Sequence, residues 1–212
     1  MKASAFWTLT ANPFSRIGGW KAFFIGFAVL LVTIGIGYWG GLAPAGLLYI
    51  MTIDNLSIST LLICHFSVLL MLFATMYITA LISTRRVRFQ DALGITVLAQ
   101  VPVLLLNALT LLMKPTINQL LSTMRNGGFE ATTRMQPLGN NLYMVLMSIL
   151  LMVTLVWYII LLYNGFKTLT DLKGAKSVVL FAILIVLCDI LSSVLISFLT
   201  NGGVNRLFFI NT

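Results

Sequence analysis

The residues from Leu142 to Tyr163 read LYMVLMSILLMVTLVWYIILLY, and this stretch contains no charged side chain. A helix rises about 1.5 Å per residue, so a stretch of this length can cross the roughly 30 Å hydrocarbon core of a bilayer. A helix also pairs its backbone polar groups internally, as lipid requires. The stretch therefore predicts a transmembrane helix.

Four further stretches have the same character, and together the five contain no Lys, Arg or Glu. Only the last contains Asp. The four lie at Ala22–Gly41, Leu61–Ile82, Ala92–Met113 and Ser177–Leu199. We therefore predict an all-α fold, a polytopic membrane protein with a bundle of five transmembrane helices.

Composition supports a membrane protein and argues against a soluble enzyme. The chain is 59% hydrophobic and 8% charged, whereas charged residues make up about 25% of an average soluble domain. The net charge of +8 comes from short basic clusters between the apolar runs. Such clusters set membrane orientation and meet anionic headgroups, so we expect a lipid bilayer as the partner and no nucleic acid.

The basic residues also predict orientation. With the N-terminus inside, nine of them fall on the inside and four on the outside. The inside set is Lys2, Arg16, Lys21, Arg85, Arg86, Arg88, Lys167, Lys173 and Lys176; the outside set is Lys114, Arg125, Arg134 and Arg206. This excess predicts an N-terminus inside and a C-terminus outside.

The expected organisation is one transmembrane domain with short flanking segments. Residues 1–21 form an interfacial segment, 22–199 the five-helix domain and 200–212 a short external tail. The longest connection is Lys114–Asn141, where Asn126-Gly127-Gly128 and Pro137 indicate turns. Within it, Thr116–Met124 is a candidate for a short helix at the membrane surface.

Asp189 is the only carboxylate in the middle of a predicted span, where an ionised Asp is expensive. Ser193 lies one turn further along the same face, and Gln100 and Asn107 share a face of the third span. Their depths allow Asp189 to bond to either amide. Two interpretations remain open: a proton- or cation-coupled site, or a hydrogen bond that locks two helices together.

Three other residues bear on helix packing. Pro102 lies inside the third span and removes a backbone donor, which predicts a kink. Gly37 and Gly41 have the small-xxx-small spacing of close helix contacts. Packing within the bundle and self-association through this face are both consistent with that spacing.

The cluster Arg85, Arg86 and Arg88 is predicted to contact anionic lipid or an acidic protein partner, or to act only as a topology determinant. His65 is the one histidine; it suits a pH sensor or an ordinary interfacial side chain. Cys64 and Cys188 lie in apolar runs without metal-ligand spacing. The sequence has no nucleotide-binding loop and no hydrolase motif, so we predict no catalytic, cofactor or metal site.

Four segments resemble the Yip (Ypt/Rab-interacting protein) domain family in its prokaryotic form. They are Asn12-Pro13-Phe14-Ser15-Arg16, Arg88-Phe89-Gln90-Asp91-Ala92-Leu93 leading toward Pro102, the end of the fourth span at Trp157–Lys167, and the linker Leu169–Lys176. The resemblance implies five spans, a cytosolic N-terminus and no catalysis. Eukaryotic relatives act in vesicle trafficking and carry a longer N-terminal region than this chain.

These observations favour a non-enzymatic integral membrane protein that organises membrane or binds other membrane proteins or itself. The shortness of the chain and the family variant point to a bacterial inner membrane. The alternative is a small transporter or channel subunit built on Asp189, Asn107 and Gln100.

Overall fold

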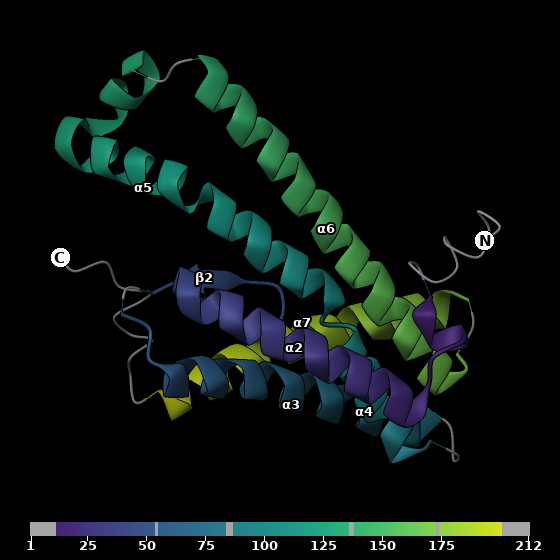
Figure 1. The fold of residues 1–212 in the computed structure, drawn as a ribbon. Helices are drawn as coiled ribbons and strands as arrows, with labels where there is room; N and C mark the ends of the chain where they lie inside the picture. The colour runs from purple at the N-terminus through teal and green to yellow at the C-terminus, as the bar shows by residue number, and fades with distance from the viewer. Residues whose placement is uncertain (1–11, 54, 84–86, 136–137, 173, 201–212) are drawn as a thin grey trace.

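A computed structural model describes residues 12–53, 55–83, 87–135, 138–172 and 174–200. Most of them are helical (Figure 1). In chain order the elements are the 3-10 helix η1 (Pro13–Ser15), α2 (Gly19–Gly40), β1 (Leu42–Pro44), β2 (Ile50–Thr52), α3 (Ile58–Ser83), α4 (Phe89–Leu98), α5 (Val101–Met135), α6 (Leu138–Thr170) and α7 (Ala175–Leu199).

Five helical segments in the described chain are long and apolar enough to cross a membrane. They are Gly19–Gly40, Ile58–Ser83, Phe89–Gln119, Leu142–Thr170 and Ala175–Leu199. The prediction of a five-span, predominantly helical membrane protein is confirmed. Large apolar side chains such as Phe24, Val153 and Val194 are more than half exposed on the bundle surface, as a surface facing lipid requires.

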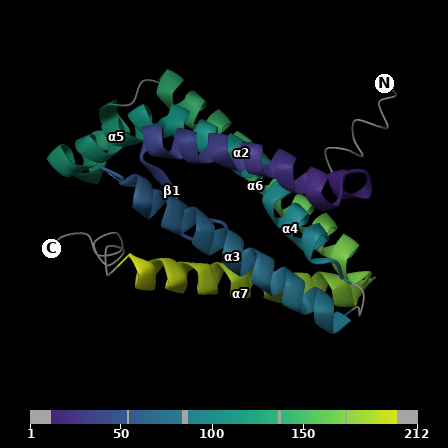
Figure 2. The same cartoon turned by 60° about the horizontal axis from the view of Figure 1, so that its bottom comes forward.

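The helices pack as neighbouring pairs, α2 with α4, α3 with α7 and α5 with α6 (Figures 1 and 2). α2 begins at one end of the bundle and α7 finishes at the other (Figure 1). A chain whose first and last helices begin and end at opposite ends of the bundle is expected to cross the membrane an odd number of times. Which end faces the cytoplasm stays a prediction.

The closest crossing joins α2 to α4 through glycines. A Cβ on Gly26 would lie 2.5 Å from the backbone nitrogen of Leu98, and one on Gly94 would lie 2.6 Å from the carbonyl oxygen of Gly19. Side chains at these positions would push the two helices apart. Small residues therefore set this contact, as they do in many membrane helix pairs.

The third span is interrupted where the sequence predicts a kink. α4 finishes at Leu98 and α5 begins at Val101, so Ala99 and Gln100 form a break immediately before Pro102. Gln100 N donates to the Val97 carbonyl at 3.1 Å, which tightens the turn. Pro102 has no N–H for the Leu98 carbonyl, and its fixed φ suits the first turn of a new helix.

The prediction of a long loop at Lys114–Asn141 is wrong. α5 runs through Pro115 to Met135, and α6 begins at Leu138, so Thr116–Met124 is part of α5 rather than a separate surface helix. α5 has 35 residues, and it turns sharply near its far end (Figure 1). The far ends of α5 and α6 extend away from the other helices (Figure 1).

α6 packs against α5. The Tyr143 hydroxyl donates to the Leu112 carbonyl at 3.0 Å, which ties α6 to α5 near Pro115.

The loop after α2 is not an ordinary surface connection. β1 and β2 pair antiparallel, with Leu42 opposite Thr52, Ala43 opposite Met51 and Pro44 opposite Ile50. We call residues 42–52 the re-entrant hairpin, because their tip turns back among the helices. This two-stranded element is the one departure from an all-helical fold among the described residues.

Candidate functional site

The re-entrant hairpin reaches α7 at Asp189. Asp189 lies ten residues before Leu199, the end of α7, which corresponds to about 15 Å along the helix. The hairpin tip therefore lies about half a hydrocarbon core's thickness below that end of the bundle. Non-helical backbone at this depth is tolerated only where protein satisfies its polar groups.

Asp189 accepts hydrogen bonds directly from the backbone of the hairpin tip. Its Oδ1 accepts hydrogen bonds from the backbone N–H of Leu47 at 2.8 Å and of Leu48 at 3.1 Å. In place of the predicted bond to an amide of the third span, the carboxylate pairs with hairpin backbone. Both bonds go to one oxygen, so an acceptor at this position is sufficient to hold the tip.

Ser193 completes the contact one turn further along α7. Its hydroxyl donates to the Ala45 carbonyl at 2.9 Å, while Ala45 N donates to the Tyr49 carbonyl at 2.9 Å. A Cβ on Gly46 would lie 2.6 Å from Asp189 Oδ1. Only glycine allows the backbone to approach α7 this closely. We call Asp189 and Ser193 the hairpin clamp.

The base of the hairpin is fixed by the end of α2. Gly41 ends this helix in a left-handed conformation, φ 64°, which glycine adopts readily. Lys114 Nζ donates to the Gly40 carbonyl at 2.6 Å. A Cβ on Gly37 would lie 2.7 Å from the Leu42 carbonyl oxygen. Gly37 and Gly41 thus pack against this chain's own hairpin, within the bundle.

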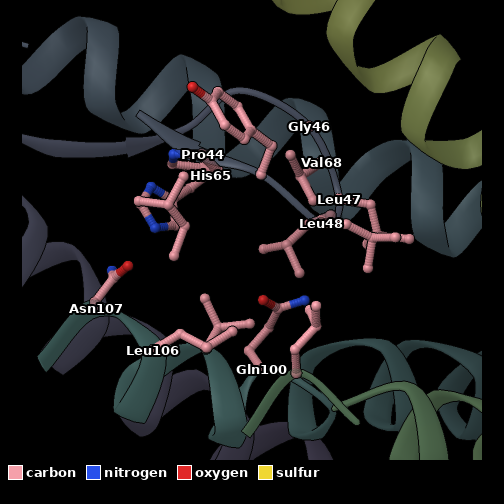
Figure 3. A pocket seen from close by; sticks show the side chains of 14 residues that line it. Pro44, Gly46, Leu47, Leu48, His65, Val68, Gln100, Leu106 and Asn107 are labelled. Atoms are coloured by element: carbon pink, nitrogen blue, oxygen red, sulfur yellow. The ribbon is translucent and has the colours of Figure 1, made fainter. Parts of the chain in front are cut away.

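A second group of polar side chains lies on the other side of the hairpin. His65 on α3, Gln100 at the break and Asn107 on α5 are each at least 96% buried. All three line a small cavity of about 20 Å³ that the hairpin residues Pro44 and Gly46–Ile50 cover. Figure 3 shows these side chains facing the same space. We call this space the polar cavity.

The four residues predicted as one intramembrane cluster therefore fall into two pairs. Asp189 and Ser193 hold the hairpin from α7, whereas Gln100 and Asn107 line the polar cavity. Asp189 is not among the residues that line the cavity. Both pairs contact the hairpin, which the sequence alone indicated to be a plain loop.

His65 is the member of the polar cavity that sequence reasoning did not place. Its Nδ1–H donates to the Leu61 carbonyl of its own helix at 3.1 Å, and its Nε2 is buried without a hydrogen-bond partner among the described residues. Gln100 Nε2 is also buried without a hydrogen-bond partner among the described residues. The buried Tyr158 hydroxyl interacts with the Gln100 side chain, although the two groups lack full hydrogen-bond geometry.

Arg88, the one described member of the basic cluster, lies at the opposite end of the bundle. Arg88, the N-cap of α4, is exposed and lines a cavity of about 230 Å³ together with Phe14, Asp91 and Thr168. Arg85 and Arg86 lie outside the described residues, as do residues 1–11 and 201–212 of the two predicted flanking segments.

The described side chains offer no site of the metal-binding type. No three His, Cys, Asp or Glu side chains gather within that part of the chain. Cys64 and Cys188 are buried in the bundle and free. The chemistry available is therefore hydrogen bonding within the bundle and charge at its ends.

Comparison with known proteins yields one match. A family model described as the Yip1 domain matches residues 4–196. The chain matches no curated protein and no solved structure at a significant level. The matched range covers all five candidate spans apart from the last three residues of α7.

Proposed function

The chain belongs to the Yip1 domain family, and from this premise we propose that it organises membrane or binds other membrane proteins without catalysing a reaction. The family consists of non-enzymatic membrane proteins of the trafficking and membrane-organisation class. The proposed setting is a bacterial inner membrane, with the N-terminus inside and the C-terminus outside. The basic clusters of the sequence support this orientation.

The proposal rests on the hydrogen bonds that the Asp189 carboxylate accepts. An intramembrane carboxylate is a transport site by default, yet here its Oδ1 pairs with two backbone amides of the hairpin. The carboxylate takes no part in lining the polar cavity. Its position is explained by the backbone that it satisfies, which supports a structural role.

A small transporter or channel subunit is the competing function. The polar cavity favours it, because buried polar groups inside a bundle often mark a pathway. The size of the cavity argues against it, since about 20 Å³ holds about one water molecule. The described bundle therefore offers no room for a larger solute at this point.

The experiment that separates the two functions replaces Asp189 with Asn in the full chain. Asn retains an oxygen that can accept both hairpin bonds, but it cannot exchange a proton. We expect the unmodified protein and the variant to crosslink the same membrane proteins in native membranes and to carry no proton or cation flux in proteoliposomes. Flux in the unmodified protein that the Asn variant loses would establish transport instead.

We further propose that Arg88 and its neighbours contact anionic headgroups. Arg88 is exposed beside a cavity lined by both polar and apolar residues, as a lipid site at the membrane boundary needs. Arg88→Gln should reduce the anionic lipid retained after detergent purification, measured by mass spectrometry. Lys176→Gln, an exposed cation at the start of α7, is the control. Equal retention by both variants would contradict a specific contact at Arg88.

A further inference from the structure

Two features of the polar cavity indicate that it binds a ligand. It is enclosed by α3, the break in the third span and the re-entrant hairpin. His65 and Gln100 are each 96% buried at its wall, and each has a side-chain nitrogen with no partner among the residues that the structure describes. A buried polar group without a partner is costly, so something is expected to pair with these nitrogens.

The tautomer of His65 defines the chemistry of that partner. A carbonyl oxygen only accepts hydrogen bonds, so the 3.1 Å contact with Leu61 places the proton of the neutral ring on Nδ1. Nε2 is then an acceptor and needs a donor. The amide nitrogen of Gln100 is a donor and needs an acceptor. One molecule that both donates and accepts would serve both groups.

The volume of the cavity limits the ligand to the size of water. About 20 Å³ exceeds the roughly 10–15 Å³ that one water molecule requires.

We propose that the polar cavity is a binding site for water, which donates a hydrogen bond to His65 Nε2 and accepts one from the Gln100 amide. The bound water joins α3 to the third span at its break. The site is distinct from the hairpin clamp, because neither Asp189 nor Ser193 is among the residues that line the cavity.

The test uses His65 as a single reporter. The chain contains one histidine, so the full-length protein, purified through a tag without histidine and labelled with ¹⁵N-histidine, gives one ring signal in bilayers. We expect the neutral Nδ1–H tautomer and polarisation transfer from water protons to Nε2. A proton on Nε2 in the neutral ring, or a dry Nε2 bonded directly to a side-chain amide, would overturn the proposal.

A cavity-filling variant provides the control. Val103 lines the polar cavity and Val178 faces outward on α7 at 53% exposed. Val103→Phe should abolish the water-to-Nε2 transfer, whereas Val178→Phe should retain it. Transfer that persists unchanged in a folded Val103→Phe protein would show that the water signal comes from elsewhere and would also overturn the proposal.

Discussion

The hairpin clamp and the polar cavity both contact the re-entrant hairpin but use polar side chains differently. Asp189 and Ser193 form hydrogen bonds to three backbone groups of the hairpin. His65 and Gln100 line a cavity with nitrogens that lack a partner among the described residues. A buried polar residue is therefore structural or available for binding according to what pairs with it.

The largest effect is expected from breaking the clamp. Asp189→Leu removes the acceptor of two backbone N–H groups at the hairpin tip, one partly buried and one exposed. A buried N–H group left unpaired costs about 1–3 kcal/mol and an exposed one costs less, so we predict a loss of about 2–4 kcal/mol in stability, measured by thermal unfolding in detergent. Asp189→Asn retains the acceptor and should lose less than about 1 kcal/mol. Equal losses in both variants would show that the charge, rather than the hydrogen bonds, matters.

A smaller effect is expected from crowding the same contact. In Gly46→Ala the new methyl would lie 2.6 Å from Asp189 Oδ1 and 2.8 Å from Ser193 Oγ. The hairpin tip must shift, at a cost of about 1–3 kcal/mol. Gly35→Ala has no atom within 4 Å of its new methyl and should be neutral or slightly stabilising. Thermal unfolding of the two proteins side by side measures the difference.

Ser193→Ala should have a modest effect. The variant removes one hydroxyl donor from the Ala45 carbonyl, and a neutral hydrogen bond contributes about 1 kcal/mol. The midpoint of thermal unfolding measures this change. A loss comparable with that of Asp189→Leu would mean that Ser193, rather than Asp189, dominates the clamp.

The smallest effect is expected on the cavity side. Gln100→Leu removes a side chain whose amide nitrogen forms no hydrogen bond with the described residues, and the replacement is similar in size and apolar. We predict a stability change of less than about 1 kcal/mol, again from thermal unfolding. A loss as large as that of Asp189→Leu would show that Gln100 forms structural hydrogen bonds, and the contrast between the two regions would fail.

Sequence reasoning recovers the spans because their lengths and lack of charge follow from the bilayer itself. It also identifies Asp189, Ser193, Gln100 and Asn107 as polar residues within the spans, of which the structure buries Gln100 and Asn107. It does not identify the partner of Asp189, because backbone amides leave no side-chain pattern in the sequence. One signal was present: the segment Leu42–Ile53 is apolar and uncharged, which is unusual for a surface loop.

The continuation of α5 into the predicted loop was missed for a different reason. Asn126-Gly127-Gly128 indicates a turn, whereas the helical backbone of α5 continues through these residues and changes direction toward its far end (Figure 1). Packing between distant segments decides such cases. The position of His65 was missed for the same reason, since the cavity wall comes from α3, the hairpin and the break together.

The pairing of the hairpin with α7 has a consequence for how the chain is made. Leu47 and Asp189 are separated by 142 positions, so the amides at the hairpin tip emerge from the ribosome long before their acceptor. Until the fifth span has been inserted, the tip cannot settle at its final depth. We therefore expect nascent chains that stop before α7 to keep residues 42–52 near the water phase, with completion of the bundle delayed until the last helix arrives.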